Sequence, residues 1–274
     1  MSGAGDAETV GDAATAGDTA TAGDTGRGSN ALARLYRRAT SGPGYAPNAA
    51  DLRDLSLFGL AFPRRASVAI LAVTALILID QLRWLIPPDR NTTLPLYDFS
   101  LGLTPVPIAR LVLFGVVPLA IVVGLFRDSP RRYGLTLGDW RWGLALLVGG
   151  LAVMTPIILA LASLPSFRSF YGDSARPLHW ALDNHLVELV PTEFMLRGFL
   201  MFALWRRIGP LALVVTQIPF VLTHLGKPEV ELWSTFVGGS VFAWLNWRTG
   251  SVLWSALGHV YVLTLMEVAV GGVV

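Results

Sequence analysis

Seven apolar runs, separated by short polar segments, dominate the sequence from residue 66 onward. A helix needs about 20 mainly apolar residues to cross the hydrocarbon core of a bilayer. The runs approach or exceed that length, so the pattern predicts an all-α fold, a polytopic transmembrane helix bundle of about seven spans. The predicted spans are 66–87, 105–126, 142–164, 178–205, 210–226, 231–248 and 251–271.

The first three runs are plainly apolar, whereas the last four carry polar and ionisable side chains. These are Asp183, His185, Glu188, Glu193, Arg197, Gln217, His224, Asn246, His259 and Glu267. An ionisable group within the bilayer costs about 2.5–3.5 kcal/mol on insertion scales, and such groups usually face the bundle interior and pair there. We therefore expect any chemistry in the last four spans. The fourth run contains Pro191 and could form two half-helices, because proline interrupts helix hydrogen bonding.

Composition supports the membrane class. The chain has 274 residues, of which 53% are hydrophobic and 15% are charged. Soluble proteins are about 45–50% apolar and about 25% charged. The arginines are spread in small groups and form no single basic patch, so no nucleic-acid partner is expected. The absence of cysteine excludes disulfides, thiolate chemistry and cysteine metal sites.

The N-terminal part divides into two segments ahead of the transmembrane domain at 66–274. Residues 1–30 repeat Ala, Gly, Thr and Asp without apolar periodicity, which predicts a disordered acidic tail and not a signal peptide. Residues 31–65 contain Arg34, Arg37 and Arg38. We interpret them as a basic, amphipathic juxtamembrane segment suited to an anionic membrane surface.

Arginine placement predicts the orientation of the chain. The arginine-rich segments alternate with poorer ones, and they contain Arg64, Arg65, Arg127, Arg131, Arg132, Arg141, Arg206, Arg207 and Arg248. Short cytoplasmic loops are enriched in basic residues. The alternation therefore predicts a multi-pass protein of the cell membrane with a cytoplasmic N-terminus.

The stretch PTEFMLRGFL places Glu193 four residues before Arg197. Residues i and i+4 share one helix face, so the two side chains can pair. Such a pair has a purely structural interpretation as a neutral link between helices. His224 and His259 on two further spans favour a second interpretation, in which the four groups converge on one site.

The chemistry open to one glutamate and two histidines is water activation, most naturally for hydrolysis. A buried glutamate can accept a proton from water, and a neutral imidazole can position the water or contact an oxyanion. We favour a metal-free site, with zinc held by Glu193, His224 and His259 as the alternative. The chain contains no His-Glu-x-x-His or Gly-x-Ser-Gly motif of other intramembrane hydrolases, and Gly-x-Gly-Asp occurs only as GAGD at residues 3–6, in the predicted tail and outside the apolar runs.

These residues resemble the motifs of the CPBP family, the CAAX proteases and bacteriocin-processing (Abi) membrane proteins. That family carries Glu-Glu-x-x-x-Arg, Phe-x-x-x-His and His-x-x-x-Asn on successive helices. Glu193 and Arg197 match the first motif in TEFMLRG, Phe220 and His224 match the second in FVLTH, and His259 matches the third in HVYVL. The similarity covers about residues 125–270.

The resemblance implies an intramembrane endopeptidase that acts on a peptide or membrane-protein substrate among membrane lipids. Glu193 would be the general base, steered by Arg197. His224 would position the water, and His259 would supply the oxyanion contact. We also expect Lys227, Phe220 and Glu188 near the substrate.

The chain departs from the family pattern at two positions. Thr192 replaces the first glutamate, which in the prenyl endopeptidase branch is implied to activate water, and Leu263 replaces the asparagine, which is implied to stabilise the oxyanion. Glu188, one turn before Thr192, is a possible substitute for the missing acid, and Glu267 for the missing amide. The alternatives are a catalytically inactive scaffold or immunity-type protein of the same family, and a transporter or proton-handling protein.

Overall fold

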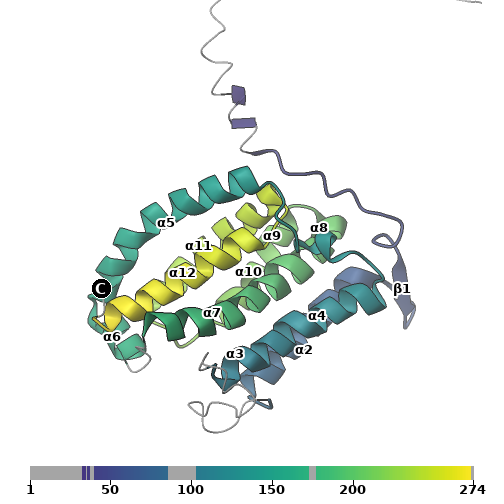
Figure 1. Cartoon of the computed structure of the whole chain (residues 1–274). Coiled ribbons are helices and arrows are strands. Elements are labelled where there is room, and N and C mark those ends of the chain that lie inside the picture. The colour runs from purple at the N-terminus through teal and green to yellow at the C-terminus, as the bar shows by residue number, and fades with distance from the viewer. Residues whose placement is uncertain (1–32, 35, 38–39, 86–102, 173–176, 273–274) are drawn as a thin grey trace, which may run out of the picture. The chain divides into compact units, whose positions relative to one another are not determined.

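The computed structural model describes residues 33–34, 36–37, 40–85, 103–172 and 177–272. Residues 1–39 and 40–274 form two separate units. In the first, residues 33–34 and 36–37 are helical, and the tail predicted at 1–30 lies outside the described residues. Everything below concerns the second unit, whose elements are shown in Figure 1.

The first β-strands of the second unit form a two-stranded antiparallel hairpin, β1 (Asp54–Leu57) and β2 (Leu60–Pro63). Leu57 pairs with Leu60 across a two-residue loop. Both loop residues have positive φ, 53° at Phe58 and 76° at Gly59, the conformation that matches the twist of a hairpin. The fold is therefore mainly helical but not all-α. The strands are too short for their alternation to stand out beside the neighbouring apolar helices.

Helices occur in the described part of each of the seven predicted spans. The first two are α2 (Arg64–Gln81) and a continuous helix of four segments, α3 (Pro105–Arg110), η2 (Leu111–Val116), α4 (Val117–Ala120) and η3 (Ile121–Leu125). The short 3₁₀ helix η4 (Pro130–Tyr133) precedes the third, α5 (Trp140–Ala162), which α6 (Pro165–Tyr171) follows. The fourth combines α7 (Leu178–Glu193), η6 (Phe194–Leu200) and α8 (Met201–Ile208). The last three are α9 (Leu211–Val215) with α10 (Gln217–Leu222), α11 (Glu229–Thr249) and α12 (Leu253–Val270).

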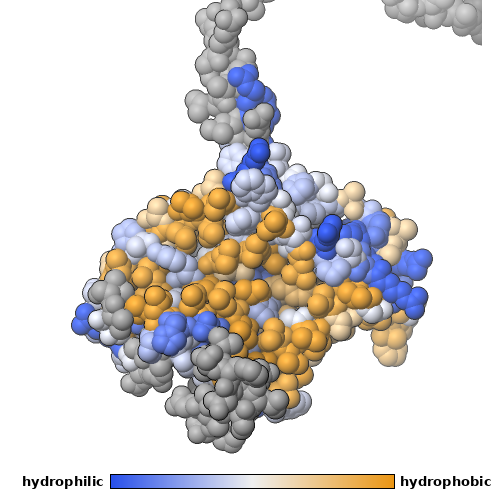
Figure 2. Space-filling model, viewed as in Figure 1, coloured by the Kyte–Doolittle hydropathy of each residue, from blue (hydrophilic) through white to orange (hydrophobic). Residues whose placement is uncertain are grey.

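Within the described residues, three helices are long and apolar enough to cross a membrane. They are Pro105–Leu125, Trp140–Ala162 and Leu253–Val270. The other predicted spans are helical but shorter or more polar. Only 6% of the apolar window of α5 is buried within the protein, so most of its side chains keep some exposed surface although the helix packs on α12. Figure 2 shows hydrophobic residues gathered over the side on which α5, α7 and α12 lie, as expected of a surface that faces lipid.

Helix α12 is central to the packing, because it contacts both α5 and α7 along much of its length and also contacts α11. Gly143 makes the contact between α5 and α12 possible. A Cβ atom at this position would lie 2.2 Å from Nε1 of Trp254, the atom that donates a hydrogen bond to the Leu137 carbonyl.

Gly143→Ala is expected to destabilise the protein by about 1–3 kcal/mol, since the added methyl group forces α5 and α12 apart. The matched control is Gly149→Ala in the same helix, where a Cβ would meet no heavy atom within 4 Å. Thermal unfolding in detergent should show a lower midpoint for the first variant and an unchanged or higher midpoint for the second. Equal midpoints would contradict this account of the contact.

An arginine–aspartate cluster fixes the segment that precedes the hairpin. Asp51 accepts hydrogen bonds from Arg65 at 2.5 Å and from Arg132 at 2.7 Å. Asp128 accepts from the same two guanidinium groups at 2.7 and 2.6 Å. Burial would raise the pKa of Asp51, but the backbone N–H of Asn48 and the two arginines outweigh it and hold this pKa below its usual value.

The depressed pKa of Asp51 predicts a loss of stability in acid. A carboxylate with a lowered pKa contributes stability above its ordinary pKa of 3.8, and this contribution disappears as the pH falls through the lower, folded-state pKa. Asp51→Asn should therefore lower stability at neutral pH by roughly 1–3 kcal/mol and flatten the decline below about pH 4.

The control for this prediction is Asp54→Asn. Asp54 pairs with Arg207 at 2.6 Å, but its side chain is 40% exposed, and exposed pairs contribute about 0–1 kcal/mol. Unfolding midpoints of the three proteins, measured between pH 3 and 7, provide the comparison. If the unfolding midpoints of wild type and Asp51→Asn fell equally with decreasing pH, Asp51 would not be the source of the acid sensitivity.

Candidate active site

The helix that carries the Glu193–Arg197 pair is continuous but changes its winding at the pair. Pro191 lies within α7, and the chain passes without a break from α7 into the π-helical segment η6 and then into α8. The two half-helices considered from the sequence are therefore one helix with a wider turn. Such π-helical turns occur often at functional sites.

Glu193 has no solvent exposure and is held by three side chains. Its Oε1 accepts hydrogen bonds from Nη1 of Arg197 at 2.5 Å and from Nδ1 of His259 at 2.8 Å. Its Oε2 accepts from the hydroxyl of Ser255 at 2.9 Å. Ser255 lies one turn before His259 in α12, so both side chains project from one helix face toward the same carboxylate. Ser255 was not among the predicted site residues, although this i, i+4 spacing could have indicated it.

Arg197 is 1% exposed and lies between Glu193 and two aromatic rings. Its guanidinium carbon is 4.0 Å from the centre of the Phe220 ring and 5.6 Å from that of Phe242. Gly239 permits this packing, because a Cβ there would lie 2.7 Å from the Phe220 ring. Phe220 thus contacts the buried arginine. The sequence analysis did not single out Phe242.

His224 and His259 lie near each other. Their rings are nearly parallel, 21° apart, with centroids separated by 6.4 Å. Nδ1 of His224 is 2.8 Å from the Phe220 carbonyl oxygen. A carbonyl can only accept a hydrogen bond, so this nitrogen carries the proton and Nε2 holds the lone pair. The carboxylate of Glu193 assigns the same tautomer to neutral His259.

Both histidines line a cavity of about 540 Å³ between α5, α11 and α12. Glu193 and Arg197 do not line it and lie behind His259 and Phe220. Most of the lining is apolar and includes Leu147, Leu151, Met154, Ile158, Phe242, Val262, Leu263 and Met266. Such a cavity suits an apolar ligand with a few polar groups.

A second polar group lines the same cavity. Nζ of Lys227 lies 2.7 Å from Glu231 and 3.0 Å from the Tyr171 hydroxyl, which donates to Glu231 at 2.7 Å. Burial, and then the charge of Glu231, raise the pKa of Tyr171, so this hydroxyl stays protonated. Lys227 was predicted near the substrate, but Tyr171 was not, because nothing in its sequence segment indicates a contact with α11.

The structure does not bring Glu188 or Glu267 to the cavity. Glu188 forms an ion pair with Arg110, which also binds Asp80. Glu267 lies 3.4 Å from Nε2 of His185. Neither residue therefore replaces the family's glutamate or asparagine, whose positions Thr192 and Leu263 occupy here. The Thr192 hydroxyl donates to the Glu188 carbonyl, and Leu263 contributes only apolar surface to the cavity.

The residues considered for zinc do not fit a metal site. Among the residues that the structure describes, no group of three His, Asp or Glu side chains is placed to hold a metal ion. The physical reason lies in Glu193, because Arg197, His259 and Ser255 already occupy both of its oxygens.

The fold and the site together define a helical membrane protein with a buried acid–imidazole pair beside an apolar cavity. Residues 174–264 match the family model described as type II CAAX prenyl endopeptidase Rce1-like. This match covers less than half of the chain but includes Glu193, Arg197, His224 and His259, and it confirms the resemblance to the CPBP/CAAX protease family. No curated protein and no solved structure matches the chain.

Proposed function

We propose that this protein is an intramembrane endopeptidase in which His259, oriented by Glu193, activates the attacking water. One observation carries the proposal. His259 contacts a fully buried carboxylate through Nδ1 and also lines the cavity. A carboxylate that fixes the tautomer and orientation of an imidazole is the arrangement by which hydrolases prepare a histidine as general base.

The roles differ from those expected from the sequence in one respect. Glu193 was expected to take the proton from water itself, but its oxygens accept hydrogen bonds from three side chains and it has no exposed surface. In the proposal it acts as the partner of His259. Arg197 is a positioning residue that holds Glu193 ionised and in place.

The reaction then follows from the free nitrogen of His259. Nε2 takes a proton from water while the water oxygen bonds to the substrate carbonyl carbon. The same nitrogen returns the proton to the departing amine as the carbon–nitrogen bond breaks. His224, whose Nδ1 is fixed by the Phe220 carbonyl, has its own Nε2 lone pair to accept the second hydrogen of the water.

The cavity supports a substrate that enters from the membrane. Its largely apolar lining suits an apolar peptide or a lipid-modified segment, and Lys227 provides a cationic group for a substrate carboxylate or carbonyl. We further propose that the arginine-rich loops face the cytoplasm of a cell membrane. Membrane lipids and a peptide or membrane-protein substrate are then the partners.

The direct test is cleavage of membrane-anchored and prenylated peptides by the purified protein in detergent containing H₂¹⁸O. Hydrolysis should place one ¹⁸O atom in the new carboxylate. Glu193→Gln should slow cleavage by about 10²–10³-fold, since the amide no longer stabilises a charged imidazole. Mass spectrometry of the products measures both effects.

The matched control is Glu229→Gln, the same chemical change at an exposed position at the start of α11. It should cleave at the wild-type rate. Equal turnover by wild type and Glu193→Gln would remove Glu193 from the mechanism. A folded wild-type protein that cleaves none of the peptides would favour the inactive scaffold or immunity-type alternative.

A further inference from the structure

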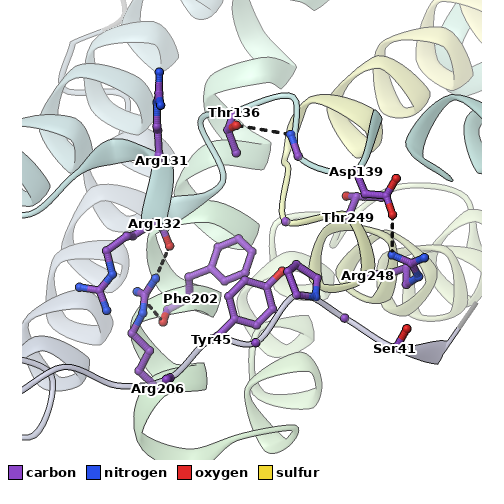
Figure 3. A pocket seen from close by; sticks show the side chains of 16 residues that line it. Ser41, Tyr45, Arg131, Arg132, Thr136, Asp139, Phe202, Arg206, Arg248 and Thr249 are labelled. Carbon is purple, nitrogen blue, oxygen red and sulfur yellow. Dashed lines mark hydrogen bonds and ion pairs between the residues drawn. The ribbon is translucent and has the colours of Figure 1, made fainter. Parts of the chain in front are cut away.

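A second cavity, of about 510 Å³, lies at another part of the same unit. It shares no lining residue with the cavity of His224 and His259. Four segments form its walls: residues 41–46, the connection at 131–139, and the helix regions at Phe202–Arg206 and Arg248–Gly250. Figure 3 shows Arg132 and Arg206 on one side, Asp139 and Arg248 on the other, and Tyr45 and Phe202 between them.

The lining of this second cavity is basic. Four arginines and one carboxylate contribute to it, namely Arg131, Arg132, Arg206, Arg248 and Asp139. Asp139 pairs with Arg248 at 3.1 Å. Behind the wall, Asp51 and Asp128 together face Arg65, Arg132 and Arg206. These five arginines and three aspartates together carry a net charge of +2.

Arg206 is the buried part of this excess charge. It is 6% exposed and donates to the backbone carbonyls of Phe202 and Arg132. Its nearest carboxylate, that of Asp51, is 3.9 Å from Nε, and this nitrogen has no hydrogen-bond partner among the described residues. A buried guanidinium with a free N–H is costly unless an anion offsets it.

The segment at 41–46 provides the backbone wall of the cavity. The Tyr45 hydroxyl donates to the Trp247 carbonyl at 2.6 Å and ties this segment to the end of α11. Gly42 packs so closely on Trp247 that a Cβ would lie 2.8 Å from the indole. The cavity is therefore built by close tertiary contacts between segments far apart in the sequence.

We propose that this cavity binds the phosphate group of an anion, either a phospholipid headgroup or a soluble phosphate. Guanidinium groups match phosphate oxygens in geometry as well as charge. The cavity also lies where arginine-rich connections meet helix ends, and basic pockets between membrane helices are known to bind phospholipid headgroups. The proposal does not depend on the proposed protease activity.

The test measures binding to the full-length, delipidated protein in detergent by native mass spectrometry. The probes are phosphatidylglycerol, phosphatidylcholine and inorganic phosphate. Two variants alter the cavity but leave the ion pairs of its walls intact. Arg131→Gln removes an exposed charge, and Gly44→Trp adds bulk where a Cβ meets no atom within 4 Å. Each should weaken binding by about tenfold, the effect of one charge-assisted hydrogen bond.

Arg141→Gln is the matched control, since it removes an exposed arginine outside the cavity lining. Tight binding of phosphatidylglycerol that only the cavity variants weaken supports a lipid headgroup. Binding of inorganic phosphate with the same variant pattern, and without a preference among lipids, supports a soluble anion. Absence of binding by all probes, or an equal loss in Arg141→Gln, would overturn the proposal.

Discussion

His259→Asn is expected to lower the rate of peptide cleavage by about 10²–10⁴-fold, the usual contribution of a general acid–base group. Asparagine has a side chain of similar polarity and can still donate a hydrogen bond to Glu193. It cannot accept a proton from water, so the chemistry is lost while the contact that stabilises α12 is kept. Initial rates on a membrane-anchored peptide, with unfolding midpoints of both proteins, measure the effect.

Two other histidines provide controls for this substitution. His185 is buried between α7 and α12 and contacts Thr264 and Glu267, whereas His179 is exposed on α7. His179→Asn should cleave at the wild-type rate, and His185→Asn should affect stability more than rate. A rate loss in His185→Asn as large as that in His259→Asn, at equal stability, would show that His259 has no special role.

The second large effect is expected at Arg197. Arg197→Met keeps an apolar side chain of similar length against Phe220 but leaves Glu193 buried without its cation. Removing one partner of a buried pair typically costs about 3–5 kcal/mol. The unfolding midpoint in detergent should fall strongly, and activity should fall with it, because Glu193 no longer holds His259.

The double variant Glu193→Gln/Arg197→Met separates charge from packing. It removes both buried charges, so it should be more stable than Arg197→Met alone, although it remains inactive. Additive losses of stability in the two single variants would contradict the interpretation of Glu193 and Arg197 as a coupled pair.

Apolar length predicted where helices form, because a run of about 20 apolar residues is what a membrane helix needs. It predicted seven spans, whereas three helices in the described part of the chain are long and apolar enough to cross a membrane. The hairpin at Asp54–Pro63 was not predicted. Its two strands have only four residues each, and a period of two cannot be recognised over so short a stretch. The one available signal was Gly59 in the Phe58–Gly59 turn, because glycine favours the positive φ that such a turn needs.

Part of the candidate site was also accessible from the sequence. The i, i+4 spacing of Glu193 and Arg197 indicated their pairing, and the structure brings His259 to the same carboxylate. The sequence could not indicate which of these groups reaches the cavity. That depends on the rotation of each helix about its axis. Apolar residues occur on all faces of these helices, so their spacing does not define that rotation.

Tertiary pairing explains the residues that the sequence misplaced. Glu188 lies on the same helix as Glu193, but it pairs with Arg110, which comes from a distant segment and also binds Asp80. Tyr171 and Phe242 are common packing residues, so the sequence gives no signal for them until α6, α11 and α12 are placed around the cavity. For Ser255 the one signal was its i, i+4 spacing to His259.

The most direct test of the central claim is ¹⁵N NMR of the four histidines in the detergent-solubilised protein, assigned by single substitution. The account predicts that His259 carries its proton on Nδ1, hydrogen-bonded to Glu193, with Nε2 unprotonated, and that Glu193→Gln changes this signal. A His259 ring that exchanges freely between both tautomers, or one that is unaffected by Glu193→Gln, would contradict the account.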